Sequence, residues 1–191
     1  LIQKKIKILP INRRTVDFEQ VSAIKKLSKI LKNDDICIFI AAEPPVKNEK
    51  MFLSNILIAK NICMAIKNIT LSHVIYISSD AVYSDSKNKI NEKSATRPEN
   101  LHGLMHITRE IMLLNTINKK DLAIIRPTLI YGKGDPHNGY GPNQFLRLIK
   151  KNKNITLFGK GEELRDHIHI DDVISALCLV ITHKFVGHLN L

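Results

Sequence analysis

The sequence has no long apolar run and only three cysteines. No apolar stretch reaches the ~18 residues that a helix needs to cross a bilayer. Lysines interrupt the apolar residues at the start of the chain, so no signal peptide is expected. Cys37, Cys63 and Cys178 lie inside apolar runs at unrelated spacings. An odd count without a Cys-x-x-Cys pair argues against a disulfide framework or a zinc site, and we expect buried free thiols in a cytoplasmic protein.

The formal net charge of +11 could indicate a protein that binds nucleic acid. The basic residues are scattered, however, and only residues 150–153 (KKNK) form a cluster, with no aromatic residues interleaved. We therefore expect neither a nucleic-acid nor a membrane partner. Such a surface would favour anionic ligands such as nucleotide diphosphates. The hydrophobic content of 44% indicates a globular protein rather than a disordered one.

Short apolar runs alternate with helical patterns through the first two thirds of the chain. The runs predict strands, and they lie at 5–11, 35–42, 73–79 and 121–126. Helical patterns begin at residue 17 and cover 49–68 and 99–118. Continuous apolar strands that alternate with helices predict a parallel sheet covered on both faces, which is the α/β doubly wound fold.

The composition changes after this point. Residues 131–144 are rich in Gly, Pro and Asn, which indicates a loop that leaves the sheet. Beyond it we expect a short helix at 143–151, a strand at 155–158 and a return to the sheet at 167–170. Asp171 is expected to cap the last helix.

Two polar segments carry the strongest signal in the sequence. The first, SSDAVY at 78–83, closes an apolar run, and the second, HGLMH at 102–106, opens the next helix. Open α/β sheets place their chemistry at the carboxyl ends of strands. The pattern resembles that of the extended short-chain dehydrogenase/reductases, which are NAD-dependent nucleotide-sugar epimerases and dehydratases. Their signatures are SSxxVYG and P-x-x-x-Y-G-x-x-K-x-x-x-E, and the matching positions of the second are Pro98, His102, Gly103, His106 and Glu110.

The resemblance extends over residues 13–191. It includes IAA at 40–42, RPTLIYG at 126–132 and ITLFGKGEELRDHIHIDDV at 155–173. It implies a Rossmann-like domain over 1–132 and 166–191, with part of a small substrate-binding lobe over 133–165.

The glycine-rich turn with which a dinucleotide-binding fold normally opens is absent. The nearest strings, GKGDPHNG at 132–139 and GKGEEL at 159–164, do not lie between a strand and a helix, and neither contains the Gly-Lys-Ser/Thr of a P-loop. We therefore expect the sequence to lack the first β-α unit, about thirty residues.

The resemblance also implies a catalytic site. Ser79 holds the position whose hydroxyl binds the reacting hydroxyl group of the substrate, while His102 and His106 replace the usual Tyr and Lys. Residues four apart share a helix face, so both imidazoles can occupy that geometry. An imidazole with a pKa near 6.5 is a competent base, which makes His102 the expected base and His106 the contact to the nicotinamide ribose.

The residue after the catalytic serine bears on the type of reaction. In the 4,6-dehydratases an Asp-Glu pair stands here, whereas this chain has Asp80-Ala81. The base for water elimination is missing, so an epimerase-like or reductase-like activity is expected, with Asp80 as a further catalytic residue.

Three other interpretations of the histidines stay open. The site could be inactive, leaving a dinucleotide-binding or regulatory protein of the same fold. The histidines could bind a metal, although HGLMH lacks the Glu of HExxH and no metal site is predicted. They could also be ordinary residues of a helix surface.

The resemblance assigns further residues to ligands. At the cofactor it places Arg13, Arg14, Ala41, Ala42, Asn55, Ser78, Arg126, Pro127 and Thr128. An arginine after the second strand of the fold can accept a 2′-phosphate, so the cofactor is NAD or NADP with a lean towards NADP. The substrate is a nucleotide-sugar, contacted by Tyr83, by Phe158 at the base and by Arg165 at the diphosphate. The full-length protein is expected to form a homodimer through the helices at 49–68 and 99–118.

Overall fold

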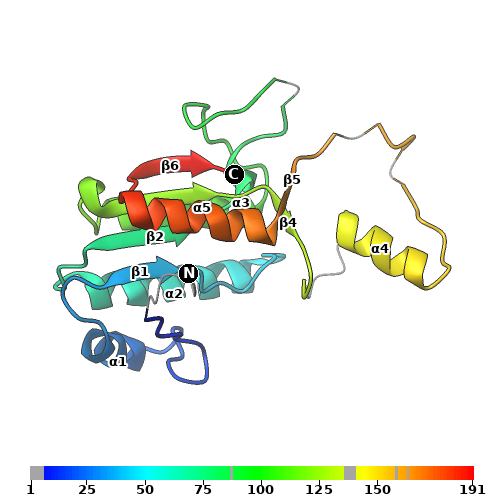
Figure 1. Ribbon diagram of the computed structural model, residues 1–191. Coiled ribbons are helices and arrows are strands. Elements are labelled where there is room, and N and C mark those ends of the chain that lie inside the picture. The colour runs from blue at the N-terminus through cyan, green and yellow to red at the C-terminus, as the bar shows by residue number, and fades with distance from the viewer. Residues whose placement is uncertain (1–6, 87, 136–140, 158, 163) are drawn as a thin grey trace.

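A four-stranded parallel sheet forms the centre of the protein. The computed structural model describes residues 7–86, 88–135, 141–157, 159–162 and 164–191. The strands follow the order β1-β2-β3-β6, and every neighbouring pair is parallel (Figure 1). Their bounds are Ile36–Phe39 for β1, His73–Ile77 for β2, Leu122–Arg126 for β3 and Gly187–Asn190 for β6.

Helices cover both faces of this sheet, as the apolar character of its strands predicts. Helices α2 (Glu49–Ile66) and α3 (Leu101–Leu114) lie on one face, and α5 (Ile170–His183) lies on the other (Figure 1). Alternate residues of a strand point to opposite faces. Tyr76 accordingly joins the core under α2 and α3, while Ile75 joins the core under α5. Helix α1 (Ser22–Ile30) packs against α2. The predicted doubly wound, Rossmann-like fold is therefore confirmed.

The remaining elements lie outside the main sheet. Strands β4 (Leu129–Tyr131) and β5 (His167–His169) pair in parallel as a separate two-stranded sheet. Helix α4 (Pro142–Lys150) stands away from the main sheet (Figure 1) and has no buried residue. Two short 3-10 turns, η2 (Asp80–Val82) and η3 (Lys119–Asp121), precede α3 and β3. Among the helices of the described residues, none is long and apolar enough to span a bilayer.

Two predicted strands are absent from the described residues. The described part of the run at 5–11 has no strand, and its Ile8 and Leu9 side chains are largely exposed. Residues 155–157 are also irregular and exposed, and position 158 lies outside the described residues. In neither case does the described part of the chain supply a neighbouring strand with which these apolar segments could pair their backbone.

Three further predictions, on a strand pairing, a helix start and a helix cap, are also wrong. Residues 167–169 pair with β4 and do not rejoin the main sheet. The first helix begins at Ser22, five residues after the predicted start. The last helix is capped by the His169 side chain, whose Nδ1 accepts from the Asp171 backbone N–H at 3.3 Å. Asp171 instead lies in the first turn of α5, where its charge complements the helix dipole.

Candidate active site

The site begins where β2 ends and η2 turns the chain towards α3. Ser79 caps η2, because its hydroxyl oxygen accepts from the Ala81 backbone N–H at 3.1 Å. Asn100 caps α3 in the same way, with its side chain accepting from the Gly103 N–H at 2.9 Å. Turn and helix touch at Gly103, where an added Cβ would lie 1.9 Å from the Ala81 carbonyl oxygen. Glycine at this position therefore lets the start of α3 lie directly against η2.

Ser79, Asp80 and His102 gather at this contact. The Ser79 hydroxyl donates to Asp80 Oδ1 at 3.1 Å. Surrounding protein atoms raise the pKa of Asp80 although its side chain reaches solvent, and the bond from Ser79 opposes this rise. Burial lowers the pKa of His102, while the nearby Asp80 charge works in the opposite direction. His102 Nδ1 is buried and has no hydrogen-bond partner among the described residues. A neutral imidazole is able to act as a general base through a ring nitrogen that reaches the substrate.

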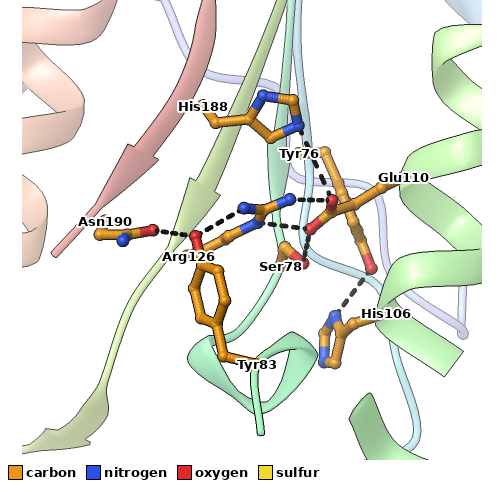
Figure 2. Close-up of polar contacts among 8 residues, drawn as sticks. All are labelled: Tyr76, Ser78, Tyr83, His106, Glu110, Arg126, His188 and Asn190. Atoms are coloured by element: carbon orange, nitrogen blue, oxygen red, sulfur yellow. Dashed lines mark hydrogen bonds and ion pairs between the residues drawn. The ribbon is translucent and has the colours of Figure 1, made fainter. Parts of the chain in front are cut away.

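His106 lies one turn further along α3. Its ring meets that of His102 edge-on, with centroids 4.8 Å apart and an angle of 86°. Its Nδ1 lies 2.8 Å from the hydroxyl of Tyr76 on β2 (Figure 2). Burial lowers the pKa of His106 to about 3, and the charges of His102 and Arg109 add to the effect. His106 is therefore neutral at physiological pH and does not supply the positive charge of the lysine it replaces.

A buried charge cluster lies beside His106 (Figure 2). Arg126 binds Glu110 through two hydrogen bonds, of 3.0 Å from Nε and 2.6 Å from Nη2. The Ser78 hydroxyl donates to Glu110 Oε1 at 2.6 Å. Arg126 also donates to the Tyr83 hydroxyl at 2.6 Å, and that hydroxyl donates to Asn190 Oδ1 at 3.0 Å. The cluster thus joins the carboxyl ends of β2, β3 and β6 to α3.

Three residues that are predicted to contact the cofactor or the substrate belong to this buried cluster. The side chains of Ser78 and Arg126 are buried and engaged with Glu110, so neither is open to a cofactor in this arrangement. Tyr83 is also buried, and Arg126 lies over its ring at 5.1 Å. As cofactor or substrate contacts, these three residues stay predictions.

Asn55 and Arg109 fix the loop after β1. The Asn55 amide accepts from the Glu43 N–H at 3.0 Å and donates to the Glu43 carbonyl at 3.2 Å. Arg109 is almost fully buried and donates to the carbonyls of Asn55 and Ala41 at 3.0–3.1 Å. Ala42 follows Ala41 in the same half-buried loop. This loop therefore has one fixed backbone path at the sheet edge where the cofactor is predicted.

A hollow of about 370 Å³ adjoins this loop, and its lining includes side chains of both charges. Arg13, Glu19, Glu43 and Ser54 are among its lining residues. Ser54 Oγ is buried without a hydrogen-bond partner among the described residues, so it is free to bind a ligand. Arg13 pairs with Glu19 at 3.0 Å, whereas Arg14 is exposed and does not line the hollow.

The remaining predicted site residues are Pro127, Thr128, Arg165 and Phe158. The Pro127 carbonyl accepts from the Asp80 N–H at 3.1 Å, and the Thr128 N–H donates to the Leu191 carbonyl at 2.7 Å. Arg165 is exposed, and its charge partly offsets the burial that raises the pKa of Asp80. Phe158 lies outside the described residues. No group of three His, Cys, Asp or Glu side chains within the described part of the chain could hold a metal ion.

Sequence reasoning missed Tyr76, Arg109, His188 and Asn190. Tyr76 contacts His106 and Arg109 contacts the loop after β1, while His188 Nε2 lies 3.8 Å from Glu110 Oε2. A signal existed for Arg109, because a charged residue three positions after His106 faces the same side of the helix. No local signal distinguishes Tyr76 from a core aromatic.

Comparison with known proteins identifies the family and the fold. A family model described as the NAD dependent epimerase/dehydratase family matches residues 1–191. A dTDP-D-glucose 4,6-dehydratase from Dictyostelium discoideum is 29% identical over 192 residues, covering 91% of this chain and 43% of the relative.

Solved structures share the fold. The UDP-glucuronic acid 4-epimerase from Bacillus cereus, in complex with UDP-glucuronic acid and NAD, superposes with a TM-score of 0.74 at 24% identity. That match covers 86% of this chain and 55% of the epimerase. A dTDP-4-dehydrorhamnose reductase from Clostridium acetobutylicum gives a TM-score of 0.80 at 20% identity, over 98% of this chain and 66% of the reductase. The chain spans about half the length of the curated relatives it matches.

Proposed function

Because the chain belongs to the NAD-dependent epimerase/dehydratase family, we propose that it carries the active site of an NAD(P)-dependent oxidoreductase that acts on a nucleotide-sugar. We infer an epimerase-like or reductase-like reaction rather than a 4,6-dehydration. One observation carries the proposal. Ser79, Asp80 and two neutral imidazoles meet where η2 and the start of α3 touch, at the carboxyl end of β2. This is where open α/β sheets bind their ligands.

Each residue has a role that its surroundings permit. NAD(P), when bound, accepts a hydride from the substrate carbon and can return it. Ser79 holds the reacting hydroxyl of the sugar, because a hydroxyl can donate and accept at once. His102 removes the proton of that hydroxyl at its unprotonated ring nitrogen, since its lowered pKa keeps it neutral at pH 7. His106 contacts the nicotinamide ribose as a neutral N–H donor, in place of an ammonium group.

The residue beside Ser79 argues against 4,6-dehydration. Elimination of water needs a second proton-transfer group next to Asp80, and the chain has Ala81 there. Oxidation and re-reduction of one carbon need only hydride transfer and one proton shuttle. Analysis of the sugar product tests this part, because a 4-keto-6-deoxy sugar would contradict it.

Substrate binding is proposed for the smaller lobe over residues 133–165. Arg165 lies close enough to influence Asp80, and a guanidinium group matches the geometry of a diphosphate. We infer that Arg165 binds the nucleotide diphosphate there.

The decisive experiment is hydride transfer by the full-length protein. We expect reduction of the nicotinamide, followed by its absorbance, on addition of at least one sugar from a panel of UDP-, GDP- and dTDP-sugars. Cofactor binding without reduction by any sugar would instead support a catalytically inactive dinucleotide-binding protein. The absence of a positive charge at His106 is the observation that favours this second candidate.

The cofactor itself is testable at Arg13. Its guanidinium lines the hollow beside the β1 loop, so we expect it to accept the 2′-phosphate of NADP in competition with Glu19. Arg13→Ala should weaken NADP binding about 10- to 100-fold, the value of a charge-assisted hydrogen bond, and leave NAD binding unchanged. Calorimetry with both cofactors measures this. Equal weakening for NAD and NADP would contradict a phosphate contact.

A further inference from the structure

Among the described residues, the hydroxyl of Tyr76 makes the one direct hydrogen bond to the His106 imidazole. Tyr76 is fully buried in β2, with its ring 5.1 Å from that of Phe39, and its oxygen lies 2.8 Å from His106 Nδ1. Figure 2 shows this hydroxyl directed at the imidazole. We propose that Tyr76 is a positioning residue that donates its proton to Nδ1 and thereby fixes His106 as the Nε2–H tautomer.

Both partners are neutral, so the direction of this bond matters. Burial raises the pKa of Tyr76 well above its ordinary range. Burial likewise lowers the pKa of His106 to about 3. A neutral imidazole has one donor and one acceptor nitrogen, and the hydrogen bond of one nitrogen decides the function of the other.

Arg109 determines the direction. Its guanidinium is almost fully buried, lies 4.9 Å from the centre of the Phe39 ring, and is held by the carbonyls of Asn55 and Ala41. Its positive charge acts on the Tyr76 hydroxyl, where it opposes the rise in pKa caused by burial. A fixed cation attracts the phenolic oxygen and turns its hydrogen away. That hydrogen then points to His106 Nδ1, which must accept.

The consequence concerns the second nitrogen of His106. Nε2 carries the proton and presents an N–H donor, which is the group needed for a ribose hydroxyl. This catalytic consequence rests on the proposed function, whereas the tautomer itself does not. A tyrosine inside the core thus fixes the tautomer of His106. A lysine at this position would need no such partner, because its ammonium group has only donors.

Nitrogen-15 NMR of the histidine side chains in the full chain tests the proposal without any variant. At pH 7 we expect the Nε2–H pattern for His106, assigned by the signal that His106→Gln removes. His73 gives an internal reference, because its Nε2 lies 2.8 Å from the Phe185 carbonyl and must carry its proton there. An Nδ1–H pattern for His106 would overturn the proposal.

Tyr76→Phe tests the cause of the preference. The ring and its packing stay, but the donor is lost, so the tautomer ratio should shift by about 2- to 13-fold, the value of one hydrogen bond. Tyr83→Phe is the matched control, since it removes a hydroxyl from the neighbouring cluster and should leave the His106 signals unchanged. An unchanged ratio in Tyr76→Phe would also overturn the proposal.

The same sample separates this proposal from the proposed function. Nε2–H signals without hydride transfer to any sugar would leave the positioning role standing and end the proposed reaction. Hydride transfer with an Nδ1–H signal would support the proposed reaction and end the positioning role of Tyr76.

Discussion

At the scale of single residues, the unusual feature is how many charges are buried. Glu110, Arg126 and Arg109 are each at most 3% exposed. Removing charges from water is expensive, and a buried charge is tolerated only when it is paired and hydrogen-bonded. Glu110 meets this condition with two bonds from Arg126 and one from Ser78. The pair therefore depends on both partners.

A substitution at Glu110 should show this dependence. Glu110→Gln keeps the size of the side chain but leaves Arg126 buried without its counter-charge, which should lower the free energy of unfolding by about 3–5 kcal/mol. Urea unfolding measures the change. Glu19→Gln is the control, because its ion pair with Arg13 is partly exposed to solvent and should contribute about 1 kcal/mol or less. Equal losses in the two variants would contradict this account.

His102 should impose a pH dependence on the reaction. The base is active when unprotonated, and burial lowers its pKa below 6.5. The value of kcat/KM should therefore be constant near neutrality and fall only as the pH drops through that lowered pKa. His102→Gln should reduce kcat by about 10²–10⁴-fold.

The control for this prediction is His183→Gln. His183 is exposed in the last turn of α5 and should leave the rate and its pH profile unchanged. If kcat/KM already falls with decreasing pH above pH 6.5, or if the fall persists in His102→Gln, the titration belongs to another group.

At the scale of elements, the contact between η2 and α3 assembles the site. Ser79 belongs to the turn and His102 to the helix, so neither element holds the site alone. Their close approach depends on Gly103, which is buried against the Ala81 carbonyl. The backbone geometry of the site therefore requires a residue without a Cβ at position 103.

Gly103→Ala should separate the two elements. The new Cβ would lie 1.9 Å from the Ala81 carbonyl oxygen, so the turn must move. We expect a loss of about 1–3 kcal/mol in the free energy of unfolding, as for an overpacked core, together with a fall in kcat. Thr108→Ala on the same helix is the control, and its effect should stay within about 0.5 kcal/mol. Full activity in Gly103→Ala would show that the contact does not position Ser79.

Strands with strong local sequence patterns could be predicted from the sequence, whereas the pairing of strands could not. The runs at 35–42, 73–79 and 121–126 became β1, β2 and β3, because their apolar residues fill both faces of a covered sheet. The runs at 5–11 and 155–158 have similar composition, but a strand also needs a partner, which local sequence does not specify.

The same limit applies to the site. Ser79, His102 and His106 stand out because polar groups close a strand and open a helix. Tyr76 lies in the middle of an apolar strand, where every second residue faces the core, and its sequence pattern is that of a packing residue. Only the fold brings its hydroxyl to His106, 30 positions away.

At the scale of the whole molecule, the parallel order of the strands brings distant segments to one edge. The carboxyl ends of β2, β3 and β6 meet there, and backbone bonds join Asp80 to Pro127 and Thr128 to Leu191. Side chains from these ends then share one buried cluster with α3. A ligand at this edge would therefore contact segments from most of the chain.

The outer surface of α2 and α3 carries exposed apolar residues. Leu53 and Met64 are eleven positions apart on α2, and Leu104 and Ile111 are seven apart on α3. Both spacings are close to whole helical turns, so each pair lies along one stripe. Contiguous apolar surface of this kind, where it is large enough, is typical of interaction sites. We expect a second copy of the chain to cover both stripes, which is the homodimer that the sequence predicts.

We therefore expect the full-length protein to be dimeric and Ile111→Lys to make it monomeric, because an ammonium group would be buried at the interface without a partner. Sedimentation at several concentrations measures the mass directly. Ile149→Lys is the matched control: Ile149 is 57% exposed on α4 and Ile111 is 54% exposed on α3, but only Ile111 lies on the proposed interface. Dissociation by both variants would indicate a general loss of solubility or folding. A monomeric wild type would remove the dimer and leave the two stripes for a different protein partner.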